Sequence, residues 1–95
     1  MWILDASEPF EMKFRLRAGH VRTLGRAPRA EFRVEAPLVS RLHCRVTGRD
    51  DSVEVVDLSS TNGTYVNGRK VKKAELKAGD RLRVGRVEMQ LSKNR

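Results

Sequence analysis

Three polar segments of the sequence carry the side chains that could do chemistry. They are Gly25-Arg26, Ser40-Arg41-Leu42-His43 and Ser60-Thr61-Asn62-Gly63-Thr64. Between them they offer guanidinium groups, hydroxyls and a side-chain amide, all of which can donate hydrogen bonds. Arginine forms charge-assisted bonds to phosphate that are roughly twice as strong as neutral hydrogen bonds. The set is therefore suited to holding an anion such as a phosphate group, and it contains no evident metal site.

A catalytic triad of Ser40, His43 and Asp57 is the alternative that these residue types allow. Serine and histidine three residues apart on an extended segment would point to opposite faces. The sequence also lacks the nucleophile elbow that exposes a catalytic serine. We therefore predict that the protein is not an enzyme and uses no cofactor or metal.

Short strands separated by turns must position the three segments. Residues 12–17 alternate Met, Phe and Leu with three cations, which is the period of a half-buried strand. Asn67-Gly68 lies between two short apolar runs, as in a two-residue type I′ hairpin, and residues 81–87 predict another tight hairpin. Eleven valines favour β-structure throughout. The prediction is an all-β fold, an antiparallel β-sandwich of two packed sheets, whose loops meet at its ends.

Length and composition bound the function further. A chain of 95 residues with 39% hydrophobic residues has room for one folded domain. The formal net charge of +8 favours an anionic partner. No apolar run is long enough for a transmembrane helix, and no signal peptide is recognisable at Met1. The single cysteine, Cys44, is expected in the core of a protein from a reducing compartment.

The order and spacing of the motifs resemble those of a forkhead-associated (FHA) domain. The Gly-Arg pair is followed by Ser-x-x-His, then by Ser-x-Asn-Gly-Thr-x-Val-Asn-Gly at residues 60–68, and then by Leu-x-x-Gly-Asp at residues 76–80. The resemblance runs from about residue 3 to residue 91. It implies a β-sandwich that binds phosphothreonine peptides in Ser/Thr-kinase signalling through loops at one end.

The resemblance also implies a role for each matched residue. Arg26 and Ser40 would hold phosphate oxygens, Thr61 would help close the pocket, and Asn62 would hydrogen-bond the peptide backbone. Arg41 would reach the phosphate or the peptide. The structural residues around the site would be Gly25, His43, Gly63, Asn67 and Gly68. Leu38 stands where some relatives carry a basic residue, so a preference for acidic peptides is not implied at that position.

We expect the chain to form a single FHA-like domain over residues 1–95, with its core at about 3–91 and a flexible tail at 92–95. The expected partner is a phosphothreonine-containing protein, such as a Ser/Thr kinase or its substrate. A monomer in the cytoplasm is expected, or in the nucleus if the source is eukaryotic, with no membrane partner. Two alternatives remain: a small basic β domain that binds nucleic acid, and an FHA fold used for phospho-independent protein–protein contact or dimerisation. Aromatic residues make up only 5% of the chain, so few rings are available for nucleic-acid bases to stack on. Nucleic-acid binding is therefore the weaker alternative.

Overall fold

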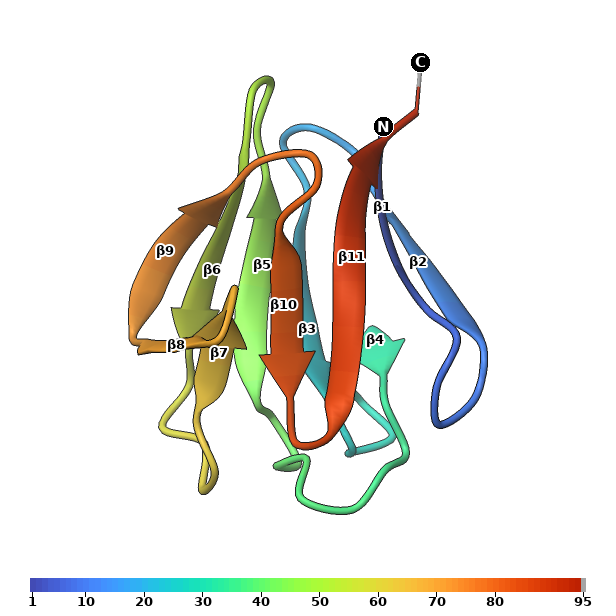
Figure 1. Cartoon of the computed structure of the whole chain (residues 1–95), viewed down its shortest axis with the longest axis vertical. Coiled ribbons are helices and arrows are strands. Elements are labelled where there is room, and N and C mark those ends of the chain that lie inside the picture. The colour runs from blue at the N-terminus through green and yellow to red at the C-terminus, as the bar shows by residue number, and fades with distance from the viewer. Residues whose placement is uncertain (95) are drawn as a thin grey trace.

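The computed structural model describes residues 1–94 and consists of two β-sheets packed face to face (Figure 1). In spatial order the first sheet contains β2 (Met12–Leu16), β1 (Trp2–Ala6), β11 (Val87–Lys93), β10 (Arg81–Val84), β7 (Thr64–Val66) and β8 (Arg69–Val71). The second contains β4 (Phe32–Arg33), β3 (Val21–Gly25), β5 (Cys44–Gly48), β6 (Val53–Asp57) and β9 (Lys73–Leu76). The predicted all-β sandwich is confirmed.

Alternation along each strand builds the core between the sheets. In β2, Phe14 and Leu16 turn inward while Lys13 and Arg15 stay exposed, as the sequence pattern predicts. Phe14 stacks on Phe32 of the other sheet, with ring centroids 4.7 Å apart and an interplanar angle of 8°. The buried aliphatic side chains from both sheets include Leu4, Leu24, Val46, Val55, Leu82 and Met89. Each such side chain contributes roughly 1.5–3 kcal/mol by leaving water, so the core anchors the loops at either end.

Both predicted hairpins are present. Val66 pairs with Arg69 across Asn67 and Gly68, whose φ angles of 50° and 83° are those of a type I′ turn. Val84 pairs with Val87 across the second two-residue turn. Register is therefore fixed locally at two points of the first sheet.

The structure departs from the sequence expectations in three places. β3 and β4 pair in parallel, through Leu24 with Phe32, whereas all other neighbouring strands are antiparallel. The core begins at Trp2, which is 3% exposed and donates its indole N–H to the Arg49 carbonyl at 2.7 Å. The predicted tail is wrong for residues 92–94, because β11 continues to Lys93 against β1 and the Asn94 amide bonds the Met1 carbonyl. Arg95 lies outside the described residues.

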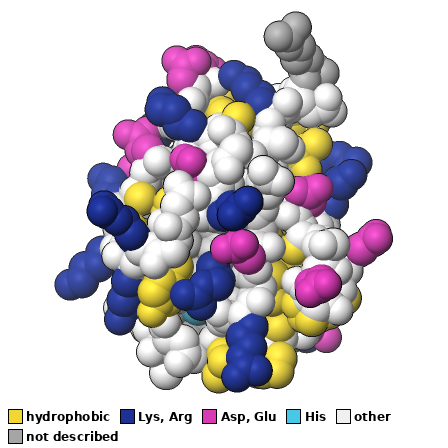
Figure 2. Space-filling model, in the orientation of Figure 1, with side chains coloured by type: hydrophobic (Ala, Val, Ile, Leu, Met, Phe, Trp, Pro, Cys, Tyr) yellow, Lys and Arg dark blue, Asp and Glu magenta, His cyan; other side chains and the backbone are white. Residues whose placement is uncertain are grey.

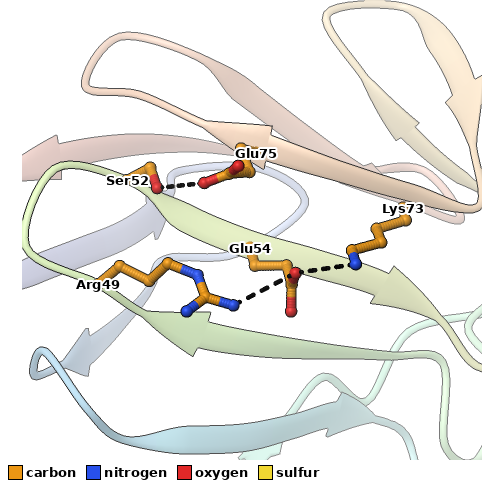
Figure 3. A network of polar contacts seen from close by, with 5 residues as sticks. All are labelled: Arg49, Ser52, Glu54, Lys73 and Glu75. Atoms are coloured by element: carbon orange, nitrogen blue, oxygen red, sulfur yellow. Dashed lines mark hydrogen bonds and ion pairs between the residues drawn. The ribbon is translucent and has the colours of Figure 1, made fainter.

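A polar network crosses the outer face of the second sheet (Figure 3). Glu54 and Glu75 are direct cross-strand partners in β6 and β9, where two negative charges would repel. Arg49 and Lys73 both pair with the Glu54 carboxylate, at 3.3 and 3.4 Å, and the Ser52 hydroxyl donates to Glu75. Partial burial opposes ionisation of Glu54, but Lys73 and then Arg49 lower its pKa overall. The network thus relieves the repulsion between the two strands.

The two ends of the sandwich differ. Both termini and the β5–β6 turn lie at one end, whereas the long loops around β4 and between β6 and β7 gather at the other (Figure 1). Within residues 1–94 there is no helix long and apolar enough to cross a membrane. The three polar segments all belong to the loop-rich end.

Candidate functional site

Loops from three parts of the chain enclose a groove of about 1060 Å³ at this end of the sandwich. The first follows β3, the second leads into β5, and the third joins β6 to β7. The groove is lined by all of the residues that the sequence analysis assigned to peptide binding, namely Arg26, Ser40, Arg41, Thr61 and Asn62. Folding therefore brings together residues that lie as far apart in the sequence as Arg26 and Asn62.

Arg26 is held by backbone groups of the loop that precedes β5. Its amide donates to the Ser40 carbonyl at 2.9 Å, and its side-chain Nε donates to the Val39 carbonyl at 3.1 Å. Within the part of the chain that is described, its two terminal amino groups have no hydrogen-bond partner. The guanidinium is thus oriented without being neutralised, which leaves a full positive charge at the groove.

Ser40 and Asn62 tie the two walls of the groove together. The Thr61 amide donates to the Ser40 Oγ at 3.0 Å, so the hydroxyl proton of Ser40 stays available to an acceptor in the groove. The Asn62 side-chain amide donates to the Leu38 carbonyl at 3.1 Å. Leu38 adopts a φ of 70°, a left-handed conformation that is uncommon for a residue with a branched side chain. Its side chain is 48% exposed and lies beside the polar groups.

His43 is completely buried beneath the groove. It bridges the loop before β5 and the β6–β7 loop. Its Nδ1 accepts the Ser40 amide at 3.0 Å, so this nitrogen carries no proton, and Nε2 donates to the Gly63 carbonyl at 2.8 Å. Residues 40–43 are bent rather than extended as expected, which lets the ring reach back to Ser40. Both ring nitrogens are engaged by backbone, and neither contacts the Ser40 hydroxyl. The arrangement is not that of a catalytic triad.

Asp57 organises the β6–β7 loop, a role that the sequence analysis did not assign to it. Its Oδ1 accepts the hydroxyls of Ser60 at 2.5 Å and Thr64 at 2.7 Å, and its Oδ2 accepts the Ser60 amide at 3.1 Å. Partial burial alone would raise the pKa of Asp57, but these bonds outweigh it and lower the pKa. An Asp followed three residues later by Ser is a pattern typical of a side-chain-capped turn, and it could have revealed this role.

The five residues assigned to the architecture of the site fall into two groups. Gly25 packs against the loop before β5, where a Cβ would lie 2.1 Å from the Arg41 carbonyl oxygen. Gly63 accepts the His43 bond and has a φ of 88°. Asn67 instead bonds Asp80 and the Arg81 amide, and Gly68 sits in open space, so this turn supports β10 and does not line the groove. Gly25, His43 and Gly63 are the three that the structure places against the groove loops.

Cys44 follows His43 and faces the core. Burial, with a smaller contribution from the charge of Asp57, raises the pKa of its thiol to about 12. The predicted burial of Cys44 is confirmed, and the thiol remains protonated and shielded.

Two packed sheets that present a polar, arginine-lined groove at one end define a β-sandwich recognition domain. The FHA domain family model matches residues 22–85, and the chain belongs to the FHA domain family.

Solved FHA domains share the whole fold. One, from a study of phosphothreonine-dependent FHA domain interactions, is 31% identical with a TM-score of 0.89, covering 99% of this chain and 97% of the other. The FHA domain of FhaA, solved in complex with the intracellular domain of Rv3910, is 32% identical with a TM-score of 0.87, covering 96% and 99%.

Curated relatives are longer proteins. An oxoglutarate dehydrogenase inhibitor of Corynebacterium diphtheriae is 37% identical over 67 residues, which is 70% of this chain and 47% of the relative. FhaA of Mycobacterium tuberculosis is 37% identical over 76 residues, which is 80% of this chain and 14% of the relative. The chain thus spans about half the length of the first and a small part of the second.

Proposed function

We propose that this domain is a phosphothreonine-dependent binding module that captures a phosphorylated segment of a partner protein, such as a Ser/Thr kinase or its substrate. The observation that carries the proposal is the groove itself, in which an unneutralised Arg26 lies beside the hydroxyl of Ser40. The solved neighbour studied for phosphothreonine-dependent interactions supports it, at 31% identity over nearly the whole chain. Because a kinase and ATP must supply the phosphate, the proposed setting is cytoplasmic.

The phosphate would bind where its charge is best matched. A phosphothreonine carries about −1.5 to −2 charge and three acceptor oxygens. Arg26 provides a forked donor and Ser40 a directional hydroxyl, while Arg41 adds a second cation from the adjacent loop residue. An unphosphorylated threonine would leave these donors without their anion. Phosphorylation is therefore the switch in the proposed mechanism.

The peptide backbone would be held by the opposite wall. Thr61 closes the pocket next to Ser40, and the Asn62 amide can both donate to and accept from a passing peptide unit. The Leu38 carbonyl accepts a hydrogen bond from this amide and holds it at the rim of the groove. The exposed Leu38 side chain would favour an apolar residue in the bound segment. A short peptide held at so few points is expected to bind with micromolar affinity, about −7 to −8 kcal/mol.

The nucleic-acid alternative is weakened by the positions of the aromatic side chains. Trp2 and Phe32 are buried, and the Arg83 guanidinium lies over the partly buried Tyr65 ring, 4.0 Å from its centroid. Phe10 is exposed, but a single exposed ring does not form a row of stacking surfaces. Figure 2 shows Lys and Arg interspersed with Asp and Glu on the face it presents, with no continuous basic track. Single-strand binding depends on stacking surfaces and such tracks.

Fluorescence polarisation with three matched peptide libraries tests the proposal. The libraries carry phosphothreonine, phosphoserine or unphosphorylated threonine at the fixed position. We expect binding confined to the phosphothreonine set, with Arg26→Ala weakening it about 100-fold, since a charged hydrogen bond and a phosphate contact are lost together. Arg29→Ala, an exposed arginine on the same loop but outside the groove, is the matched control and should bind normally. Equal binding of all three libraries, or full affinity in a folded Arg26→Ala variant, contradicts the proposal.

A further inference from the structure

Arg33 is a cation of the groove that the FHA motifs do not include. It is on β4, the short parallel strand, and its side chain lines the groove together with Arg26. Its Nε donates to the Arg26 carbonyl at 3.3 Å, which ties the two arginines to one stretch of backbone. Its Nη1 lies 2.7 Å from the Glu35 carboxylate. A second guanidinium is thus positioned next to the residue proposed to hold phosphate.

Glu35 is an unfavourable residue for a phosphate-binding groove. It is the one carboxylate among the lining residues, where Arg26, Arg33 and Arg41 supply the positive charge. A negative side chain at this position repels an anionic ligand. Pairing with Arg33 offsets that repulsion, but it also withdraws Arg33 from the ligand.

The Arg33–Glu35 ion pair lies where a ligand anion can readily replace Glu35 as the partner of Arg33. The side chains are 46% and 60% exposed, so both ions are well hydrated in or out of the pair. Exposed ion pairs contribute little to stability, because solvent screens the attraction and both side chains lose freedom. An incoming anion of higher charge, or one held in place by the rest of a bound peptide, can compete for the guanidinium.

Building on the proposed phosphopeptide function, we propose that Arg33 leaves Glu35 to bind a second anionic side chain of the peptide, a carboxylate or a second phosphate, and so selects doubly anionic ligands. Without a second anion, Arg33 stays paired with Glu35. The Glu35 carboxylate then disfavours ligands whose only anionic group is the phosphothreonine. Arg33 is then a specificity residue, distinct from the phosphate site at Arg26 and Ser40.

Peptide scanning tests this selection. In a phosphothreonine peptide, each neighbouring position is substituted in turn by Gln, Glu or phosphoserine, and affinities are measured by isothermal titration calorimetry. At one or two positions we expect Glu to bind about 5-fold and phosphoserine about 10-fold more tightly than Gln, as charge-assisted bonds allow. Arg33→Ala should remove or reverse this preference, because the unpaired Glu35 carboxylate then repels each added negative charge. Arg29→Ala is the matched control and should keep the difference.

Glu35→Gln should increase affinity, whereas Arg33→Ala removes a preference. This gain separates the proposed effect from a loss of binding caused by misfolding. The substitution of Glu35 frees Arg33 and removes the repulsion, so peptides with a second anion should bind about 3-fold more tightly than to the unmodified protein. Loss of the fold cannot produce such a gain. Equal affinity for Gln, Glu and phosphoserine peptides, or a preference that survives Arg33→Ala, overturns the inference. If the Gln phosphothreonine peptide itself does not bind, the proposed function fails instead, so the two failures are distinguishable.

Discussion

Arg26 and Arg33 lie in the same groove but are held by different partners. Backbone carbonyls orient Arg26, through Nε to Val39, and leave its charge uncompensated. Arg33 is fixed by one carbonyl and by a carboxylate, so its charge is compensated until a ligand replaces Glu35. Because of this difference, we propose that Arg26 binds the phosphate and that Arg33 selects a second anionic group.

Asp57 provides a pH-dependent test at the scale of one residue. Its lowered pKa means that folding favours the ionised carboxylate, so the stabilisation is complete above about pH 4 and is lost as the pH falls through the lowered value. We expect Asp57→Asn to reduce the free energy of unfolding by about 1–3 kcal/mol at neutral pH, because the hydroxyls of Ser60 and Thr64 lose a charged acceptor. Urea denaturation at several pH values measures this.

The difference between the two proteins should shrink toward acid pH, since the carboxylate of the unmodified protein then also becomes neutral. Asp51→Asn, in the exposed β5–β6 turn, is the control and should show no comparable loss. A constant difference across the pH range would mean that Asp57 acts by shape alone.

The residues of the site were predictable to the extent that they belong to a pattern. Arg26 could be chosen among the Gly-Arg pairs only because Ser40-x-x-His43 follows at the right distance. Arg33 belongs to no such pattern, and its role depends on a contact with Glu35 that only the folded chain creates. The spacing of Asp57 and Ser60 indicates a capped turn, but the further bond from Thr64 to Asp57 depends on the fold. Asn67 forms the predicted hairpin with Gly68, and its side-chain amide bonds Asp80, which does not line the groove.

At the scale of elements, the end of β3 meets the loop before β5 more closely than a side chain would allow. The Gly25 carbonyl accepts the Val34 amide, and the Arg26 and Ala27 amides bond the backbone of Ser40 and Arg41. These bonds place the loop proposed to bind phosphate directly on the strand. The strands themselves were predictable from alternation and turn residues, whereas β4 was not, since two residues are too few to show a period.

Gly25→Ala tests this contact. The new Cβ would lie 2.1 Å from the Arg41 carbonyl oxygen, so the loop must move. We expect a loss of about 1–3 kcal/mol in the free energy of unfolding and at least a tenfold loss of phosphopeptide affinity, roughly 1.4 kcal/mol or more. Thermal denaturation and fluorescence polarisation measure the two effects.

The matched control is Gly68→Ala, at the turn that does not line the groove. A Cβ there meets no atom within 4 Å, but the φ of 83° strains any side chain. It should cost about 1–2 kcal/mol and leave peptide affinity unchanged. If Gly25→Ala behaved in the same way, the close approach would not be needed for binding.

At the scale of the whole molecule, the loops that line the groove lie at one end of the sandwich, and the start of β1 and the β5–β6 turn lie at the other (Figure 1). The terminal strands are joined to each other through Trp2 and Lys93, and Trp2 is bonded to the β5–β6 turn. The groove loops are cross-linked by His43, Asn62 and the Ser40 hydroxyl above a continuous core. The loops that line the groove are therefore held in a defined arrangement by the fold itself.

The most direct test of phosphothreonine binding at this groove is an amide chemical-shift titration by two-dimensional nitrogen–proton NMR. A phosphothreonine peptide is added to the labelled protein, and the same peptide without phosphate serves as the control. We expect only the phosphorylated peptide to shift resonances, with the largest shifts at Arg26, Arg41, Thr61 and Asn62. His20 and Arg49, beside and within the β5–β6 turn, should stay unchanged. Equal shifts with both peptides, or shifts on a sheet face with the groove unaffected, would contradict phosphothreonine binding at this groove.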